Sequence, residues 1–392
     1  MDFDLPDSAL AVREGVAAVA AKYTHEYWSR CEHEHRFPQE AYDDLAAGGW
    51  FGLAVPEEYG GGGQGMLELA VANETLCASG GTAGTFFYIT TPGFGGMTIS
   101  RHGTDEQKAR VLPGLATGQA QFCLALTEPD AGSNAIEITT SARREGDEFV
   151  IRGQKVWISN VENATWMVVV TRTIPAAEAT PRTAGFTLFL VDVKQALAAG
   201  TLTYTPIPKM GSNILHSSQV FFDDLRVPAE NVIGEVDNGF SVLWDVLNPE
   251  RILAAAGGVG AADAALAVAC DYARERVVFG KQIGSNQALQ FPLAQIKAKA
   301  ELGRLMTYRA AWLFDQRRPC GNEANIAKLT GAQVAFESAN QAFQTFGGMA
   351  YSQEYPVERL FRDARIGKNI PVAEELVLAH IGTQMLGLPK SY

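Results

Sequence analysis

Residues 149–159, FVIRGQKVWIS, decide the fold class, because they read as a β-strand in a chain whose two ends read as helices. Apolar residues alternate there with polar ones, which is typical of a half-buried strand. Further segments rich in Val, Phe and Thr follow, separated by turn signals such as EGDE and PRTAG: WMVVVTRT (166–173), GFTLFLVDV (185–193), LTYTPIPK (202–209) and SSQVFFDDL (217–225). Residues 121–235 are therefore predicted to form a small antiparallel β-domain.

The chain on either side of these strands has helical spacing. In residues 1–120, the runs AVREGVAAVAAKY, PQEAYDDLAAGGW and MLELAVANETLCAS place apolar residues three and four positions apart. Residues 236–392 contain Ala-rich amphipathic runs such as PLAQIKAKAELGRLMTYRAAWLFDQ. Helices, strands and helices in separate blocks predict an α+β protein with a helical domain at each end, rather than an alternating α/β sheet.

The amino-acid composition limits the classes of function that the protein can have. The 392 residues carry 32 Lys and Arg against 44 Asp and Glu, so the formal net charge is 32 − 44 = −12. A chain with 47% apolar residues can bury a substantial core, and its acidic balance argues against nucleic-acid binding. Residues 271–330 depart from this balance with 10 basic and 5 acidic side chains, a net charge of +5. Such a basic stretch could receive a phosphorylated small molecule, or it could be a solvated helix face.

The predicted location is the cytoplasm, with no membrane span. Five cysteines without CxxC spacing favour free thiols in a reducing compartment, and the acidic N-terminus MDFDLPDSAL does not resemble a signal peptide. Residues 252–269 are long and apolar enough to cross a bilayer. They contain Asp263 and many Ala and Gly residues, however, which favours a buried, closely packed helix.

Several short motifs have a structural interpretation that outweighs the functional one. Gly60, Gly62 and Gly65 match GxGxxG, but no βαβ pattern surrounds them, so a surface loop is expected. The stretch from Cys31 to His35 (CEHEH) has metal-ligand residue types, yet no second cluster completes a site. We therefore expect no metal, and a solvated turn at this stretch.

Two segments are more informative. Residues 127–134, TEPDAGSN, combine a strand end, a Pro-stiffened turn and free hydroxyls that could face a polar ligand, although an ordinary strand connection is the alternative. Trp157 stands in an alternating strand two residues before Ser159, which suits a planar heterocycle. Core packing is the alternative for this tryptophan.

Together with three C-terminal segments, these motifs carry a family resemblance. TEPDAGSN, GQKVWISN, VFFDDLRVPAENVIGE, RERVVFGKQIGSNQ and QTFGGMAYSQEYPVERLFRDARI occur in the order and spacing of the acyl-CoA dehydrogenase family, over nearly all 392 residues. The resemblance implies an N-terminal helical domain, a barrel-like middle β-domain and a C-terminal four-helix bundle. It also implies a homotetramer with non-covalent FAD that oxidises an acyl-CoA thioester to the α,β-enoyl form in lipid or acid catabolism. An electron-transferring flavoprotein would then accept the electrons.

The resemblance also implies roles for individual residues. The flavin ring would contact Leu126, Thr127, Trp157 and Ser159. The substrate would contact Ser133 and Arg251. Residues implied to bind the pyrophosphate and adenine of a neighbouring subunit's FAD are Arg276, Phe279, Gln287, Gln344, Gly347 and Gly348. Arg is a natural partner of pyrophosphate, and Gly lets the backbone approach it, so these residue types agree with the implied chemistry.

The catalytic base is where the chain departs from its family. The position of the usual Glu, about eight residues after the RDA of the last helical hairpin, is Pro371, which has neither a carboxylate nor an N–H group. In the isovaleryl and long-chain branches the base comes instead from a Glu-Arg pair opening the first long C-terminal helix. Here that pair is Glu250-Arg251, after Pro249. Glu250 is therefore the predicted base, with Glu374 and Glu375 as rivals.

Other departures leave several functions open. Asn213, Leu215 and His216 replace Arg, Ser and Asp of the family, and Ala373 replaces a flavin-contacting Thr. The same fold could serve as an enoyl-thioester reductase, a carrier-protein-linked dehydrogenase or a flavin monooxygenase. A subunit without a base that holds FAD in a heteromer is a further alternative. The acyl chain is not determined by sequence, although small residues at 254–260 suggest room for a branched or cyclic group.

Overall fold

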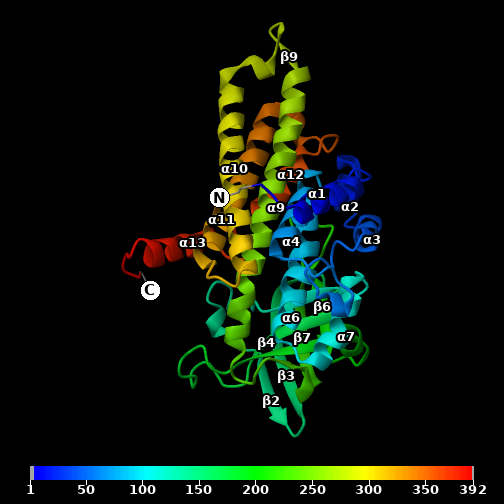
Figure 1. Cartoon of the computed structure of the whole chain (residues 1–392), viewed down its shortest axis with the longest axis vertical. Helices are drawn as coiled ribbons and strands as arrows, with labels where there is room; N and C mark the ends of the chain where they lie inside the picture. Colours follow the sequence, from blue (N-terminus) through cyan, green and yellow to red (C-terminus); the bar gives the residue numbers. More distant parts are fainter. Residues whose placement is uncertain (1–3, 391–392) are drawn as a thin grey trace.

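A computed structural model describes residues 4–390 and shows three regions along the chain (Figure 1). The N-terminal region is helical: α1 Asp7–Ala20, α2 His25–His33, α3 Gln39–Ala47, α4 Met66–Ala78, α5 Thr85–Tyr88, a π-helical segment η3 Ile89–Gly96, α6 Met97–His102 and α7 Asp105–Ala116. Helix α7 starts at a capping box, in which Thr104 and Gln107 bond each other's backbone N–H groups. The residues from Gly60 to Gly65 form the predicted loop, which ends at the start of α4.

The middle region is one eight-stranded sheet with a short helix, α8 Val193–Ala198. Its strands are β1 Phe122–Ala125, β2 Ser141–Glu145, β3 Glu148–Ser159, β4 Trp166–Arg172, β5 Phe186–Asp192, β6 Leu202–Pro206, β7 Ser217–Pro228 and β8 Val232–Ile233. The order is β6-β7-β3-β2-β4-β5-β8, with β1 beside β4. Most pairs are antiparallel, but β1 and β2 each pair with β4 in parallel, so the sheet is mixed rather than wholly antiparallel.

The C-terminal region is built on three long helices, α9 Gly239–Glu275, α10 Gln287–Asp315 and α11 Gly321–Phe346, with α12 Val357–Ile366 packed on α11. A two-stranded hairpin, β9 Val277–Val278 and β10 Lys281–Gln282, caps the far end of α9 and α10, and α13 Glu374–His380 projects to the side (Figure 1). Helix α4 of the N-terminal region also packs on α9. The predicted helical, β and helical architecture is confirmed.

The predicted start of the first long C-terminal helix was wrong. Helix α9 begins at Gly239, so Pro249 lies inside it and Glu250 is in its fourth turn. The preceding turns are stabilised by the burial of Val242, Leu243 and Val246, which outweighs the hydrogen bond that Pro249 removes.

Helix α9 is long and apolar enough to cross a membrane by length and composition, with a mean hydropathy of 1.8 in its most apolar window. Inside the protein, 72% of that window is buried, as is typical of a core helix. A Cβ at Gly258 would lie 2.6 Å from the carbonyl oxygen of Gly331, so these glycines let α9 and α11 cross backbone against backbone.

Candidate active site

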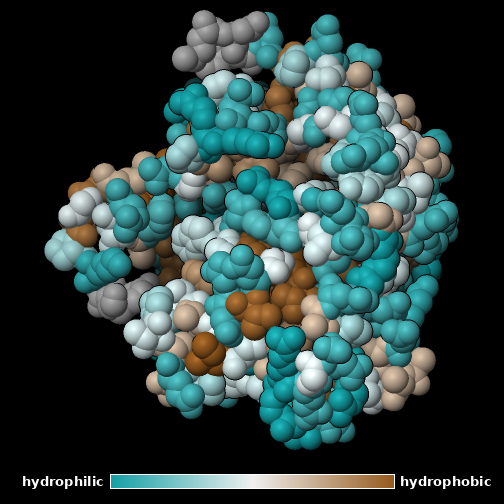
Figure 2. Space-filling view, turned by 60° about the horizontal axis from the view of Figure 1, so that its bottom comes forward, coloured by the Kyte–Doolittle hydropathy of each residue, from teal (hydrophilic) through white to brown (hydrophobic). Residues whose placement is uncertain are grey.

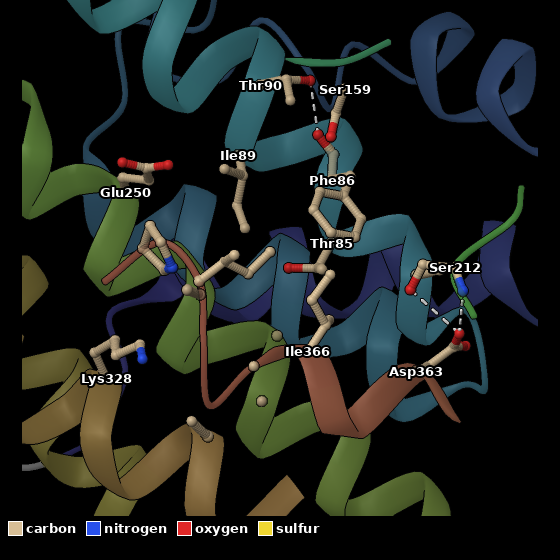
Figure 3. Close-up of a pocket in the computed structure, with 18 of the residues that line it drawn as sticks. Thr85, Phe86, Ile89, Thr90, Ser159, Ser212, Glu250, Lys328, Asp363 and Ile366 are labelled. Atoms are coloured by element: carbon tan, nitrogen blue, oxygen red, sulfur yellow. Dashed lines mark hydrogen bonds between the residues drawn. The ribbon is translucent and has the colours of Figure 1, made fainter. Parts of the chain in front are cut away.

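A cavity of about 250 Å³ lies where the three regions meet (Figure 3). Four of the residues with an expected flavin contact line it, namely Leu126, Thr127, Trp157 and Ser159, and Glu250 and Pro371 line it too. The N-terminal region contributes mainly Thr85, Phe86, Ile89 and Thr90. Small residues form much of the remaining wall: Ala254, Gly257, Gly258, Ala261, Ala332, Ala335, Ala364 and Gly367. The expected room near residues 254–260 therefore faces the cavity.

Trp157 is turned toward the cavity by an irregularity of the sheet. The register of β3 against β7 shifts between Lys155 and Ile158, and Trp157 has φ +63°, a backbone region that bulky residues avoid. Its side chain is 56% exposed, so the alternative of core packing was wrong. Strained residues are concentrated at functional sites, and Ser212, which also lines the cavity, has φ +56°.

The loop TEPDAGSN is anchored by its residue Glu128, which binds residues on neighbouring segments. The carboxylate of Glu128 accepts the backbone N–H groups of Thr139 and Thr140, at 2.7 and 2.9 Å, and an N–H of the Lys155 ammonium at 2.9 Å. Lys155 also donates to the carbonyl of Leu126 at 2.9 Å. Although burial acts to raise the pKa of Glu128, the Lys155 charge and these hydrogen bonds lower it to about 2. The pair holds Leu126 and its neighbour at the cavity wall.

Ser133 lies away from the cavity. It is exposed on the outer part of the TEPDAGSN loop and is not among the lining residues. The first residue of the loop, Thr127, faces the cavity, so the loop is more than a strand connection there. The tip of the loop is exposed to solvent.

Glu250 is the carboxyl group of this cavity that has no partner. Within residues 4–390 it makes no hydrogen bond and no ion pair, and burial raises its pKa to about 7 against the opposing charge of Arg251. The other lining carboxyl, Asp363, accepts hydrogen bonds from Thr82 and Ser212 and lies across the close-up from Glu250 (Figure 3). A carboxyl with a pKa near neutrality is suited to accept a proton.

The two rival carboxylates do not line the cavity. Glu374 accepts a hydrogen bond from Gln333 at 2.6 Å and pairs with Lys368 at 3.0 Å. Burial acts to raise the pKa of Glu374, but these contacts lower it overall. Glu375 is exposed on α13. The structure thus brings Glu250, and neither rival, to the wall that Pro371 shares.

Arg251 is buried directly behind this wall. Its Nη1 donates to Asn248 at 3.1 Å, whereas its buried Nε has no partner in the described chain. Arg251 does not line the cavity, so the structure does not place it against a substrate there. Burial lowers its pKa, but a guanidinium keeps its charge, and that charge acts on Glu250 from within α9.

A second cavity, of about 550 Å³, gathers five of the six residues expected to bind pyrophosphate and adenine: Arg276, Phe279, Gln344, Gly347 and Gly348. Gln287 is exposed nearby at the start of α10 and does not line it. Phe279 is fully exposed, and a Cβ at Gly347 or Gly348 would meet nothing within 4 Å. The space, the cation and the exposed ring fit a dinucleotide from outside the chain.

The two cavities are too far apart for one cofactor. Arg276 follows Glu250 by 26 positions along α9, a distance of about 39 Å at helical rise. This separation exceeds the span of one FAD, so one FAD bound in the first cavity would not reach the second cavity of the same chain. The first cavity, with its apolar walls and Trp157, fits a flat ring such as isoalloxazine.

The structure adds site residues that were not predicted. Lys328 on α11 lines the first cavity, and its ammonium, although buried, donates to the carbonyl of Val372. Asp363 is held by Ser212 and Thr82. No local pattern signals such residues, because their partners are distant in sequence.

The stretch CEHEH joins the N-terminal region to the middle and C-terminal regions through Glu32. Its first residues end helix α2, and Glu32 is 1% exposed, whereas Glu34 and His35 form the expected exposed turn, so the prediction holds only for the end of the stretch. Glu32 accepts the backbone N–H groups of Asn213 and Ile214 and the side-chain N–H groups of Asn213 and Arg362. Among residues 4–390 there is no group of three His, Cys, Asp or Glu placed to hold a metal ion.

Comparison with known proteins agrees with this geometry. Sequence models of the acyl-CoA dehydrogenase N-terminal, middle and C-terminal domains match residues 6–119, 123–225 and 237–385. Acyl-CoA dehydrogenase FadE12 of Mycobacterium tuberculosis is 39% identical over 384 residues, 97% of each chain. The caffeyl-CoA reductase-Etf complex subunit CarC of Acetobacterium woodii is 33% identical and covers 88% of each chain.

A solved glutaryl-coenzyme A dehydrogenase–glutaryl-CoA complex superimposes on the chain with a TM-score of 0.94 and 30% identity, over 100% of this chain and 98% of that one. The three domain matches leave few residues uncovered. The chain therefore belongs to the acyl-CoA dehydrogenase family of FAD-dependent oxidoreductases, which act on CH–CH groups.

Proposed function

We propose that this chain oxidises an acyl-CoA thioester to the α,β-enoyl-CoA, with Glu250 as the base. The observation that supports this most is the position of Glu250, an unpartnered carboxyl with a pKa of about 7 in the cavity that Trp157 and Thr127 line. Pro371 stands on the same wall without a carboxylate. The proposed base, Glu250, therefore lies on helix α9, whereas Pro371 occupies the family's usual position for the base, in the loop before α13.

The residues of the chain have separable tasks in this reaction. FAD, when bound, would supply the acceptor for the hydride that leaves the β-carbon. Glu250 takes the α-proton onto a carboxylate oxygen, and its apolar surroundings keep water from competing for that proton. Trp157 and the Leu126–Thr127 strand end would hold the flavin ring, and the cavity walls from α5, η3 and α9 would hold the acyl group against it.

The proposed reaction predicts bleaching of the bound flavin on anaerobic mixing with a suitable acyl-CoA. The purified holoenzyme is mixed with straight, branched and cyclic acyl-CoA thioesters, and flavin absorbance and enoyl product are recorded. Oxidation of at least one of these thioesters is expected, because the base and the flavin-site residues share one cavity. If no thioester bleaches an enzyme that carries FAD, the proposed function is wrong.

The pKa of Glu250 predicts a pH dependence. Burial raises this pKa to about 7, and only the deprotonated carboxylate can accept the α-proton. The rate of flavin reduction should therefore rise with pH through about 7 and level off above it, with a roughly tenfold loss one pH unit below the pKa. Stopped-flow reduction from about pH 5.5 to 9 tests this. A rate that falls across this range would contradict a carboxylate base.

The electron acceptor, assembly and location are proposed on separate grounds. An electron-transferring flavoprotein is the proposed acceptor, supported by family membership and by the name of the CarC complex.

A homotetramer is supported by the second cavity, which needs another copy's cofactor, and by exposed apolar side chains on α10: Phe291, Leu302, Leu305 and Trp312. One face of the molecule shows apolar patches between hydrophilic areas (Figure 2). A cytoplasmic location is supported by the five cysteines, which form no disulfide in the described chain.

A second candidate is the reverse reaction, the reduction of an enoyl thioester. The name of CarC, a caffeyl-CoA reductase subunit, favours it, because the same cavity would serve both directions. Assay in both directions with the same acyl group distinguishes the two. Turnover that occurs only with a carrier-protein thioester, oxygen-dependent hydroxylation by reduced flavin, or activity only with a partner subunit would identify the other functions that the sequence left open.

A further inference from the structure

The N-terminal wall of the first cavity carries three threonines, and the hydroxyl proton of one of them has no acceptor. Thr82 donates its proton to the carboxylate of Asp363 at 2.8 Å. Thr90 donates to the carbonyl of Phe86, four residues earlier, at 2.8 Å. Thr85, at the start of α5, has no oxygen or nitrogen acceptor for its proton in the described chain. The reaction described above gives this hydroxyl no task.

Asn73 holds the hydroxyl of Thr85 in place. The amide nitrogen of Asn73 donates to the carbonyl of Leu253 at 2.8 Å, and because only the nitrogen can donate, this bond fixes the orientation of the amide. The same nitrogen donates to Thr85 Oγ at 3.1 Å. Thr85 is therefore an acceptor toward Asn73, which is fully buried, and its own proton remains available to a ligand.

The hydroxyl of Thr85 lies against α9 at a place that requires a glycine. A Cβ at Gly257 would stand 2.3 Å from Thr85 Oγ, which is closer than any real contact. Gly257 follows Glu250 by seven positions, a distance of about 10 Å at helical rise. Ala254, between them, also lines the cavity, and in the close-up Thr85 lies between Glu250 and Asp363 (Figure 3). The hydroxyl is therefore presented well beyond the base, where an acyl group extends away from its reacting carbons.

The surroundings of this hydroxyl suit an uncharged oxygen. Burial raises the pKa of the Cys77 thiol, whereas the backbone and hydroxyl of Thr85 act to lower it, so the thiol lies beside the hydroxyl. Sulfur is a weak acceptor and does not compete with an oxygen for the Thr85 proton. The only basic residue that lines the cavity in the described chain, Lys328, donates to the carbonyl of Val372. A carboxylate at Thr85 would be buried without a paired cation, whereas a hydroxyl or carbonyl oxygen needs none.

We propose that Thr85 is a specificity-determining residue for acyl-CoA thioesters whose acyl group carries an uncharged oxygen, a hydroxyl or keto group, several carbons beyond the reacting pair. The Thr85 hydroxyl donates to that oxygen. An unsubstituted hydrocarbon chain leaves the Thr85 proton desolvated and unpaired, which weakens binding. The neighbouring walls from Phe86, Ile89 and Ala261 are apolar and pack the carbon chain. The inference rests on the proposed function, because it names the acyl group that this reaction takes.

Thr85→Val tests this role, because valine keeps the shape of threonine and removes the hydroxyl. Binding is measured by isothermal titration of FAD-loaded Glu250→Gln, which does not consume the thioester. The probes are octanoyl-CoA and the isomers of hydroxyoctanoyl-CoA with the hydroxyl on each of the last four carbons. With Thr85 present, at least one isomer should bind about three- to tenfold more tightly than octanoyl-CoA, the range for one net hydrogen bond. Thr85→Val should remove this preference, and Thr85→Ser should keep it.

Thr98→Val is the matched control. Thr98 is fully buried and donates to the carbonyl of Phe94 at 2.7 Å, but it does not line the cavity, so its replacement should leave the preference intact. Equal binding of octanoyl-CoA and every hydroxy isomer would overturn the role of Thr85, as would a preference that survives in Thr85→Val. Failure of the proposed function is a separate result, because it shows as absence of flavin bleaching in the wild type, whatever the titrations give.

Discussion

Replacement of Glu250 by Gln is expected to lower the rate of flavin reduction by acyl-CoA by about 10²–10⁴-fold, the usual contribution of a general base. The reason is that no second carboxyl is free in the cavity: Asp363 is bound by Ser212 and Thr82, and Pro371 has no side-chain acid. Gln preserves the size of the side chain, so FAD content and acyl-CoA binding should stay near wild type. Single-turnover stopped-flow under anaerobic conditions measures the rate, and flavin absorbance measures the FAD content.

Glu374→Gln is the control for this prediction. Glu374 lies close to Pro371 in sequence but is held by Gln333 and Lys368 outside the cavity. Its replacement should leave the reduction rate within a few-fold of wild type. The assignment of the base would have to move to Glu374 if this variant, rather than Glu250→Gln, lost reduction.

Glu32→Ala is expected to lower the free energy of unfolding by about 3–5 kcal/mol, the range for removing one partner of a buried charge pair. The carboxylate that disappears is 1% exposed and accepts hydrogen bonds from Asn213, Ile214 and Arg362. The buried backbone N–H groups of Asn213 and Ile214 would be left without an acceptor, whereas Arg362 would keep its bonds to Glu358 and Met210. Denaturant unfolding of the holoenzyme, followed by tryptophan and flavin fluorescence, measures the loss.

Glu34→Gln is the control variant for Glu32→Ala. Glu34 stands two residues away, is exposed, and contacts Arg36 at 3.5 Å at the surface. Its replacement should alter the free energy of unfolding by no more than about 0.5 kcal/mol. Equal midpoints for Glu32→Ala and Glu34→Gln would show that Glu32 does not join the regions.

The strands and helices were predictable because their patterns are local. Residues 148–159 and 166–172 alternate or are continuously apolar as buried strands do, and they form β3 and β4. The parallel pairing of β1 with β4 was missed, because the pairing of strands far apart in the chain leaves no local pattern. The start of α9 was misplaced because Pro249 was read as a first-turn proline, whereas burial of Val242 and Val246 extends the helix through it.

Some residues of the candidate site could likewise be predicted from the sequence, and others could not. Leu126, Thr127, Trp157 and Glu250 were found through contiguous motifs and a family pattern, and the structure brings them together in one cavity. The roles of Glu32 and Lys328 were not predictable, because each depends on partners that are distant in sequence or on backbone carbonyls. Backbone carbonyls occur at every residue, so a sequence cannot show which of them a buried ammonium selects.

Exchange of the α-hydrogen tests the central claim, that Glu250 removes this proton, most directly. An acyl-CoA that reduces the wild-type flavin is deuterated at the α-carbon and incubated with the holoenzyme in water, and its deuterium content is followed by mass spectrometry. We predict that the wild type releases the deuterium to water and that Glu250→Gln, with FAD bound, retains it. Release at the wild-type rate by Glu250→Gln would contradict the account, because another group would then be taking the proton.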